Sequence, residues 1–189
     1  MTRREIMQYI TYVTGVTVSI PLASALLSGC KTDAAANTDN YKPVLFSDTQ
    51  FISLEKLVDT ILPKTDSPSA SEVGVHRMID AMTECYDQKE KAKYKNGFEA
   101  LLSHLKEKAG NIQFSSLPEE ERIKILKQLD TQDDDNLAKI GYLQLKQQTI
   151  AYYLNTEEIA TNYLNYDPVP GDYIGCINLS EVNGKAWAL

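Results

Sequence analysis

The stretch 137-LAKIGYLQLKQQTIAYYL-154 decides the fold class of this chain. It predicts one long helix whose apolar side chains lie nearly all round the helix axis. They are Leu137, Ile140, Tyr142, Leu143, Leu145, Ile150, Tyr152, Tyr153 and Leu154. A helix that is apolar on all sides either lies at the centre of a helical domain or is covered by a partner protein. Either the other helices or a partner protein is therefore expected to pack around residues 137–154.

Four more helices are predicted before this stretch, because apolar residues recur there at helical spacing. Ser47 and Gln50 have the spacing of a capping box at the start of the first helix, which ends at Pro63. Ser116 and Glu119 have the same spacing at the start of the fourth. The apolar faces are Phe51, Leu54, Leu57, Val58 and Ile61 in the first, Val75, Met78, Ile79, Met82 and Tyr86 in the second, Tyr94, Phe98, Leu101, Leu102 and Leu105 in the third, and Ile123, Leu126 and Leu129 in the fourth.

After residue 154 the helical pattern shortens and then stops. Thr156 is expected to cap a short sixth helix, and the aspartates 133–135 to precede or cap the fifth. The segment 166-YDPVPGDYIGC-176 contains two prolines and two glycines, which exclude a helix. No strand pattern longer than a few residues occurs. The sequence thus predicts an all-α fold, a single bundle of about five to six helices over residues 47–189 with an irregular C-terminal arm.

The first 29 residues are interpreted as an export signal. Arg3 and Arg4 form a short basic head, an uncharged and moderately apolar run follows over residues 6–27, and the run ends in 27-LSGC-30. This tetrapeptide is a lipobox, so Cys30 is expected to carry the lipid of a bacterial lipoprotein that faces the periplasm. The alternative is a membrane helix that happens to contain this cysteine.

Adjacent arginines also occur in twin-arginine signals, which route folded proteins across the bacterial inner membrane. Ile6 stands where that pattern usually has Phe, so export as an unfolded chain remains the alternative. Residues 30–46 are expected to form a lipidated tether, since the part up to Asn40 is small and polar. Within it, residues 41–46 are where the chain is expected to dock first on the helical domain.

Charge and cysteine content limit the classes of partner and the redox state. The formal net charge is −7, which argues against nucleic acid as a partner because phosphate contacts need Lys and Arg. Besides Cys30 the chain has Cys85 and Cys176. Outside the cytoplasm such a pair can close as a disulfide. The alternative is two separate buried thiols.

No residue pattern in the sequence points to catalysis. His76 and His104 lie on different predicted helices, and neither has a second His or Cys at metal-ligand spacing. No glycine pattern frames a serine nucleophile, no Cys-x-x-Cys-His sequence attaches a haem, and no glycine-rich loop binds a dinucleotide. We therefore expect this chain to contain no catalytic residue, metal site or cofactor of its own.

Aromatic residues gather toward the C-terminus. Six of the eleven tyrosines lie between residues 142 and 173, and Trp187 follows. Tyr and Trp are enriched at protein interfaces, because their rings bury area while keeping a polar tip. The alternative is that these rings pack the core. The candidates for binding a partner are the arm residues Tyr166, Pro168, Pro170, Tyr173 and Trp187.

Four segments, taken in order, resemble a known family. They are the Arg3-Arg4 start with its lipobox, 46-FSDTQ-50 leading into 57-LVDTILPKTDSP-68, the residues from 73-VGV-75 to Cys85 and Tyr86, and 168-PVPGDYIGC-176. Together they span most of the chain after the signal. The chain resembles the gluconate 2-dehydrogenase subunit 3 family, the small subunits of periplasmic sugar-acid dehydrogenases.

The resemblance implies a role beside an enzyme. Such subunits accompany a large flavoprotein of the glucose-methanol-choline type, which holds FAD and oxidises the sugar or sugar acid. A cytochrome c subunit with haem c often completes the complex. The small subunit would then bind and stabilise the flavoprotein and escort it through export. The alternative is a free-standing helical envelope lipoprotein that binds another protein or a ligand.

Overall fold

The computed structural model describes residues 41–132, 136–169, 171 and 176–188. Within these residues the chain forms six α-helices and no strand, which confirms the all-α prediction. The α-helices are α3 (Asp48–Ile61), α4 (Val75–Met82), α5 (Gln88–Lys108), α6 (Glu119–Thr131), α7 (Leu137–Leu154) and α8 (Glu157–Tyr163). Short 3-10 turns are η2 (Thr83–Cys85), η3 (Phe114–Ser116) and η4 (Leu179–Val182).

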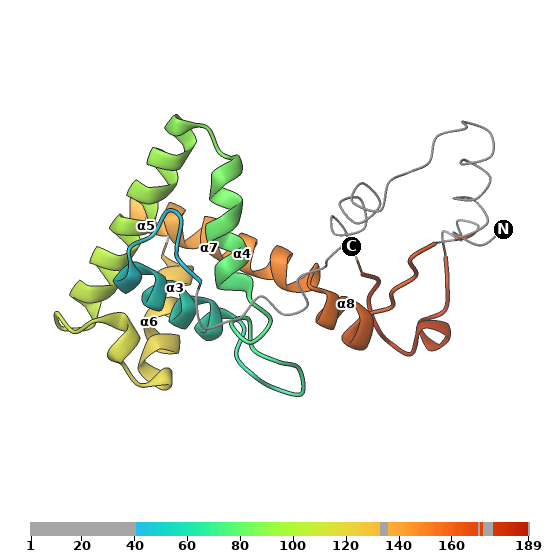
Figure 1. The fold of residues 1–189 in the computed structure, drawn as a ribbon. Helices are drawn as coiled ribbons and strands as arrows, with labels where there is room; N and C mark the ends of the chain where they lie inside the picture. The colour runs from blue at the N-terminus through green and yellow to red at the C-terminus, as the bar shows by residue number, and fades with distance from the viewer. Residues whose placement is uncertain (1–40, 133–135, 170, 172–175, 189) are drawn as a thin grey trace, which may run out of the picture. The chain divides into compact units, whose positions relative to one another are not determined.

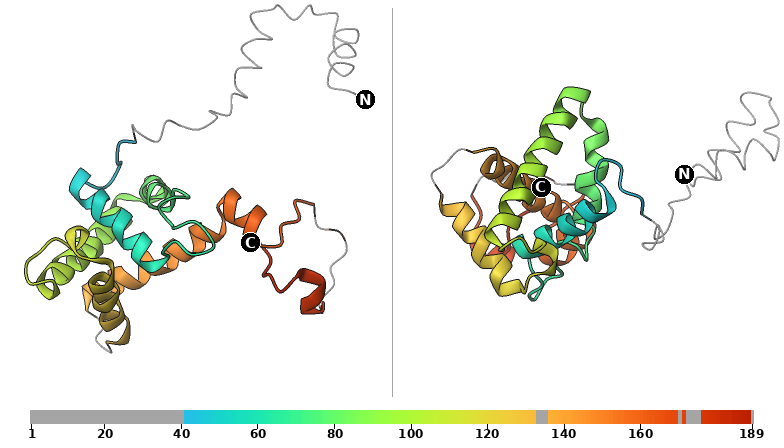
Figure 2. Two further views of the ribbon diagram at one scale, coloured as in Figure 1. Left: turned by 90° about the horizontal axis from the view of Figure 1, so that it is seen from below. Right: turned by 90° about the vertical axis from the view of Figure 1, so that its left-hand side faces the viewer.

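Helix α7 is the central element of the domain, as its apolar sequence predicted. It packs against α3, α4, α5, α6 and α8, and its contact with α5 is the most extensive in the bundle. Helix α4 leads into the η2 turn, α5 returns from it, and both lie across α7 (Figure 1). Helix α3 also contacts α4 and α6, and Figure 2 shows the bundle from two further sides.

A close approach of two backbones brings α5 and α7 together. Gly141 of α7 meets Gly97 of α5, and a Cβ built on Gly141 would lie 2.8 Å from the carbonyl carbon of Gly97. Around this crossing the apolar faces predicted from sequence form one core. Its fully buried large side chains are Leu54, Leu57, Ile79, Leu101, Leu105, Leu129, Leu145 and Ile159.

The two predicted capping boxes have different outcomes. At α3 the prediction is confirmed, because Gln50 N donates to Ser47 Oγ (3.3 Å) and Ser47 N donates to Gln50 Oε1 (3.0 Å). At α6 it is wrong. Ser116 belongs to the η3 turn, which buries Phe114, so α6 begins after Pro118 without a side-chain cap.

Polar side chains also stand at the starts of α7 and α8, but only the one at α7 caps its helix. Asn136 caps α7 by accepting from Lys139 N (2.9 Å), while the aspartates 133–135 proposed for this role lie outside the described residues. Thr156 precedes α8 as predicted, but its hydroxyl donates to Tyr153 O (2.8 Å) and caps no helix N–H.

Two buried charged residues tie distant parts of the domain together. Asp80 of α4 accepts from Val44 N (2.7 Å) and Leu45 N (3.0 Å), which docks the entering chain as expected for residues 41–46. The Lys139 ammonium of α7 donates to backbone carbonyls at the end of α6. Its acceptors are Leu129 O (2.7 Å), Asp130 O (2.6 Å) and Gln132 O (3.1 Å).

Candidate partner-binding surface

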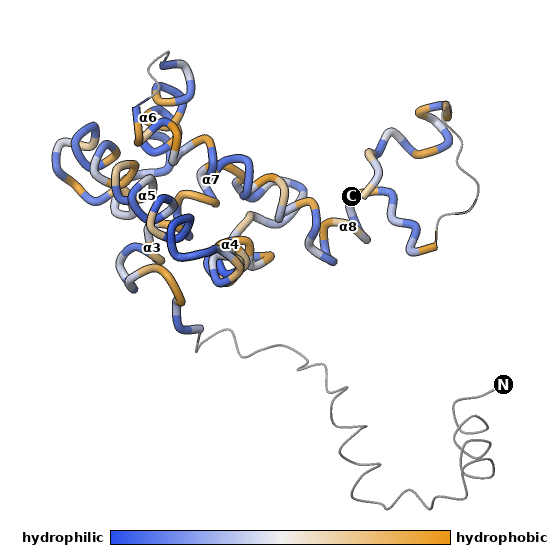
Figure 3. Tube along the Cα trace, turned by 90° about the horizontal axis from the view of Figure 1, so that it is seen from above, coloured by the Kyte–Doolittle hydropathy of each residue, from blue (hydrophilic) through white to orange (hydrophobic). Residues whose placement is uncertain are grey.

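One side of α7 faces solvent although it is apolar. Leu137, Ile140, Leu143 and Ile150 are 48%, 45%, 37% and 40% exposed. Gln144, Gln147 and Ala151 fill the positions between them. We call these seven residues the α7 outer face. Figure 3 shows hydrophobic residues recurring along the length of α7.

The α7 outer face carries no charge. The only charged residues of α7 are Lys139, which is buried under α6, and Lys146, whose ammonium lies at the edge of the helix and binds Asp130 at 2.8 Å. Charged residues make up 24% of the whole chain. Depletion of charge around exposed apolar side chains is typical of the centre of a protein interface and not of ordinary surface.

A groove adjoins this face at its N-terminal half. Tyr86, Glu90, Lys93 and Tyr94 line it on one side, Ile140 and Gln144 on the other, and its volume is about 330 Å³. Its aromatic wall is fixed by hydrogen bonds through Gln148, which accepts from Tyr94 Oη (2.8 Å) and donates to Tyr86 Oη (2.8 Å). Burial raises the pKa of Tyr94 far above its ordinary value, so its hydroxyl stays protonated and keeps its role as donor.

The helix beside the groove is basic in its first half. The segment 88-QKEKAKYK-95 contains four lysines and one glutamate, in a chain whose net charge is −7. Lys93 of this segment reaches the groove. Glu90 reaches it as well, so the surface around Ile140 is apolar along α7 and carries charges of both signs along α5, where the segment 88–95 has a net positive charge.

The C-terminal arm presents part of the aromatic surface predicted from sequence. Tyr166 and Trp187 are both 54% exposed, while Pro170 and Tyr173 lie outside the described residues. Backbone hydrogen bonds from Asn165 N to Ala186 O (2.8 Å) and from Ala188 N to Asn165 O (2.9 Å) tie the end of the arm beside α8. Pro168 is exposed in the part of the arm that follows α8. The alternative that the tyrosines pack the core is confirmed for Tyr142 and Tyr153, whereas binding of a partner by the exposed Tyr166 stays a prediction.

The remaining residues predicted to act in export or bridging divide into two groups. Arg3, Arg4 and Cys30 lie outside the described residues. Cys85 and Cys176 are separate, exposed thiols, so neither the predicted disulfide nor the alternative of two buried thiols describes the structure. Cys85 ends the turn between α4 and α5, whereas the arm that carries Cys176 is tied beside α8.

The two histidines form no catalytic pair. His76 is 5% exposed, its ring lies 5.2 Å from that of Phe51, and its Nδ1 has no hydrogen-bond partner among the described residues. Burial lowers the pKa of His76, with a smaller opposing effect from Glu55. In the part of the chain that the structure describes, no three His, Cys, Asp or Glu side chains gather to hold a metal ion.

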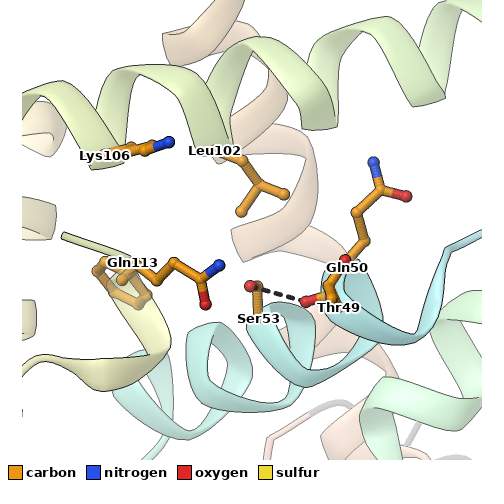
Figure 4. A pocket seen from close by; sticks show the side chains of 7 residues that line it. Thr49, Gln50, Ser53, Leu102, Lys106 and Gln113 are labelled. Carbon is orange, nitrogen blue, oxygen red and sulfur yellow. Dashed lines mark hydrogen bonds between the residues drawn. The ribbon is translucent and has the colours of Figure 1, made fainter. Parts of the chain in front are cut away.

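A small polar pocket lies between α3, α5 and the η3 turn (Figure 4). Its volume is about 160 Å³, and Leu102 of α5 and Phe114 of the η3 turn supply its apolar lining. Lys106 supplies its only titratable side chain. The Ser53 hydroxyl donates to Thr49 O (3.0 Å), so it is held by its own helix and not by a general base.

Comparison with known proteins now assigns the family. The sequence model described as Gluconate 2-dehydrogenase subunit 3 matches residues 48–171. The chain belongs to this family. The resemblance seen in its segments is thereby confirmed. Neither the curated proteins nor the solved structures contain a match to the chain.

Family membership identifies the chain as an accessory subunit of a dehydrogenase. The match covers α3 to α8 and therefore includes the whole α7 outer face. Over the described ranges, no helix has both the length and the hydropathy that a membrane span requires. In a chain that belongs to a family of subunits, the uncharged and apolar α7 outer face is thus the candidate surface for binding a protein partner.

Sequence reasoning anticipated the face but not its neighbours. Because residues 137–154 are apolar nearly all round, the sequence predicted a helix that is central or covered by a partner. The structure shows a central helix with one buried side and one exposed apolar side, and cover by a partner stays a prediction. It missed the groove beside Ile140 and the lysines of α5. The signal available was the run of four lysines over 89–95 in an otherwise acidic chain.

Proposed function

We propose that this chain is the non-catalytic small subunit of a flavin-dependent sugar or sugar-acid dehydrogenase. Its large subunit is a flavoprotein of the glucose-methanol-choline type, which holds FAD and carries out the oxidation. A cytochrome c subunit with haem c receives the electrons. The small subunit binds and stabilises the large one, and its own residues take no part in hydride or proton transfer.

The α7 outer face is the observation that carries this proposal. Burying apolar surface contributes about 25 cal/mol per Å², so four large aliphatic side chains left 37–48% exposed are a cost for a subunit that works alone. A partner that covers them removes that cost. The family assignment supports a dehydrogenase subunit as that partner.

The N-terminal sequence supports an additional role in export. In this proposal Arg3 and Arg4 belong to a twin-arginine signal, and the flavoprotein, already folded around FAD, crosses the inner membrane bound to this chain. Cys30 then anchors the complex to the cell envelope on its periplasmic side through its lipid. Replacing both arginines with lysine is expected to leave the flavoprotein in the cytoplasm. Unchanged export of the flavoprotein would remove the escort role.

Purification of the tagged, mature chain from its native envelope tests the proposed function. A complex is expected in which a second, larger polypeptide accompanies the chain and the eluate has the absorbance spectrum of flavin. That eluate should oxidise sugars or sugar acids with an artificial electron acceptor. A colourless single polypeptide, under conditions that preserve complexes, would instead support a free-standing helical lipoprotein.

A further inference from the structure

The spacing of the α7 outer face specifies the shape of what covers it. Ile140, Leu143, Gln147 and Ile150 follow one another at intervals of three, four and three residues. This is the spacing of the contact seam between two helices that cross at a shallow angle. From Ile140 to Ile150 the seam rises about 15 Å along the helix axis, at about 1.5 Å per residue. A second helix can follow that line, whereas an irregular loop gains nothing from the regular spacing.

The charges beside the seam specify the chemistry of the occupant. The groove next to Ile140 contains Glu90 and Lys93, and the α5 segment 88–95 to which both belong carries four lysines against that one glutamate. No salt bridge of Lys93 is formed within the described residues. An occupant that lies on Ile140 and Gln144 therefore needs an acidic side chain at the end that passes α5, and uncharged side chains along the rest of its contact.

We propose that the α7 outer face and the adjoining groove receive one amphipathic helix of the flavoprotein subunit. This inference rests on the proposed function and adds the surface, the secondary structure and the charge pattern of the contact. The helix lays an apolar seam along Ile140, Leu143 and Ile150, and places an acidic residue beside Lys93. Gln144 and Gln147 hydrogen-bond to polar side chains of the helix and set its register.

A second copy of this chain fits the surface less well. In such a pair another α7 would lie on the seam, and the segment 137–154 contains no acidic residue to meet Lys93. The C-terminal arm is the competing surface for the flavoprotein, since Tyr166 and Trp187 are exposed on it. Both alternatives give results different from those of the proposed contact in the experiment below.

Site-specific photocrosslinking in the native complex tests the contact. Benzoylphenylalanine is introduced at position 140 or 150 of the α7 outer face, or at position 166 or 187 of the competing arm. Position 52, an isoleucine of α3 that is 50% exposed, serves as the matched control. The complex is purified from the envelope and irradiated, and the crosslinked peptides are identified by mass spectrometry. Positions 140 and 150 are expected to reach two sites in one flavoprotein segment that are about ten residues apart, since both helices rise equally per residue. Position 52 is expected to give no crosslink.

Three results would overturn the inference. They are crosslinks from 140 and 150 to another copy of this chain, crosslinks to flavoprotein sites whose spacing does not fit a helix, or an intact complex that crosslinks only from positions 166 and 187. In each of these cases the flavoprotein still co-purifies if the proposed function is correct. Absence of any flavoprotein from the preparation is a separate result, which rejects the proposed function and this inference with it.

Charge reversal gives a second, independent measurement. Lys93→Glu is expected to weaken binding of the flavoprotein about tenfold and to reduce its dependence on salt concentration. Lys106→Glu, at an exposed lysine farther along the same helix, is the control and should bind as the parent does. Equal affinities for the parent and both variants at low salt would contradict the acidic contact.

Discussion

The crossing of α5 and α7 at Gly97 and Gly141 makes a sharp prediction about stability. The two glycines face each other, but a Cβ added to each meets a different environment. On Gly141 it would lie 2.8 Å from the Gly97 carbonyl carbon and still closer to the carbonyl oxygen. On Gly97 it would lie 3.6 Å from the Gly141 Cα, an ordinary van der Waals contact. Gly97→Ala is therefore the matched control for Gly141→Ala.

The loss of stability expected for Gly141→Ala follows from how far the α5 and α7 backbones must move apart to accept the added Cβ. Contacts become ordinary at 3.4 Å, so relief requires a movement of at least 0.6 Å (3.4 − 2.8) between two backbones, neither of which can rotate away. Such overpacking costs up to about 3 kcal/mol. Alanine returns about 1 kcal/mol of helix propensity at either position. Gly141→Ala should thus lower the free energy of unfolding by about 2 kcal/mol, and Gly97→Ala should raise it by up to about 1 kcal/mol.

Urea unfolding of the mature chain, followed by far-ultraviolet circular dichroism, measures both effects. With a slope of about 2 kcal/mol per M, the midpoint for Gly141→Ala should fall by about 1 M urea. The midpoint for Gly97→Ala should stay or rise. If the two variants shift the midpoint equally, or if Gly141→Ala is as stable as the parent, the close backbone approach does not hold the two helices and the reasoning is refuted.

Three further predictions follow from other features. Lys139→Met removes the ammonium that caps α6 and should lower the free energy of unfolding by about 3 kcal/mol, as measured by thermal or urea unfolding. The control Lys146→Met loses only an exposed ion pair and should lower it by less than about 1 kcal/mol. Equal losses for the two variants would contradict the capping role of Lys139. Because burial lowers the pKa of His76 below 6.5, the unfolded chain binds a proton that the folded chain does not, so stability should fall as the pH drops through 6.5 and below. His76→Gln should flatten this slope by up to about 1.4 kcal/mol per pH unit, as measured by urea unfolding of the parent and the variant at a series of pH values. Parallel slopes for the two proteins would reject the role of His76. Truncation before Tyr166 should leave the helical content of α3–α8 intact by circular dichroism, and loss of that signal would show that the arm is part of the fold.

The helices were predictable because their apolar residues recur every three or four positions, a local property. Leu101 and Leu105 of α5 lie where that spacing puts them, in the core beside α7. The start of α6 was predicted two residues early, since Ser116 matches a capping pattern but belongs to the η3 turn, which buries Phe114. That burial depends on contacts with α3 and α5, which are distant in sequence.

The candidate surface was predictable only in part, for a similar reason. An apolar helix such as α7 shows in the sequence that it is covered, but not which of its sides the same chain covers. That division depends on α5, which crosses at Gly97 and leaves Ile140 and Ile150 outside. The arm residues Tyr166 and Trp187 were predicted from composition, and their role in binding stays a prediction.

The mass of the complex extracted from the envelope tests the central claim most directly. Native mass spectrometry of the gently solubilised protein, with release of bound cofactor at higher collision energy, gives both composition and cofactor in one measurement. We predict a species that contains this chain, of 21.2 kDa before processing, together with a larger polypeptide that releases FAD. A species at the mass of the processed chain alone, or of two copies of it, with no flavin released, would contradict the account.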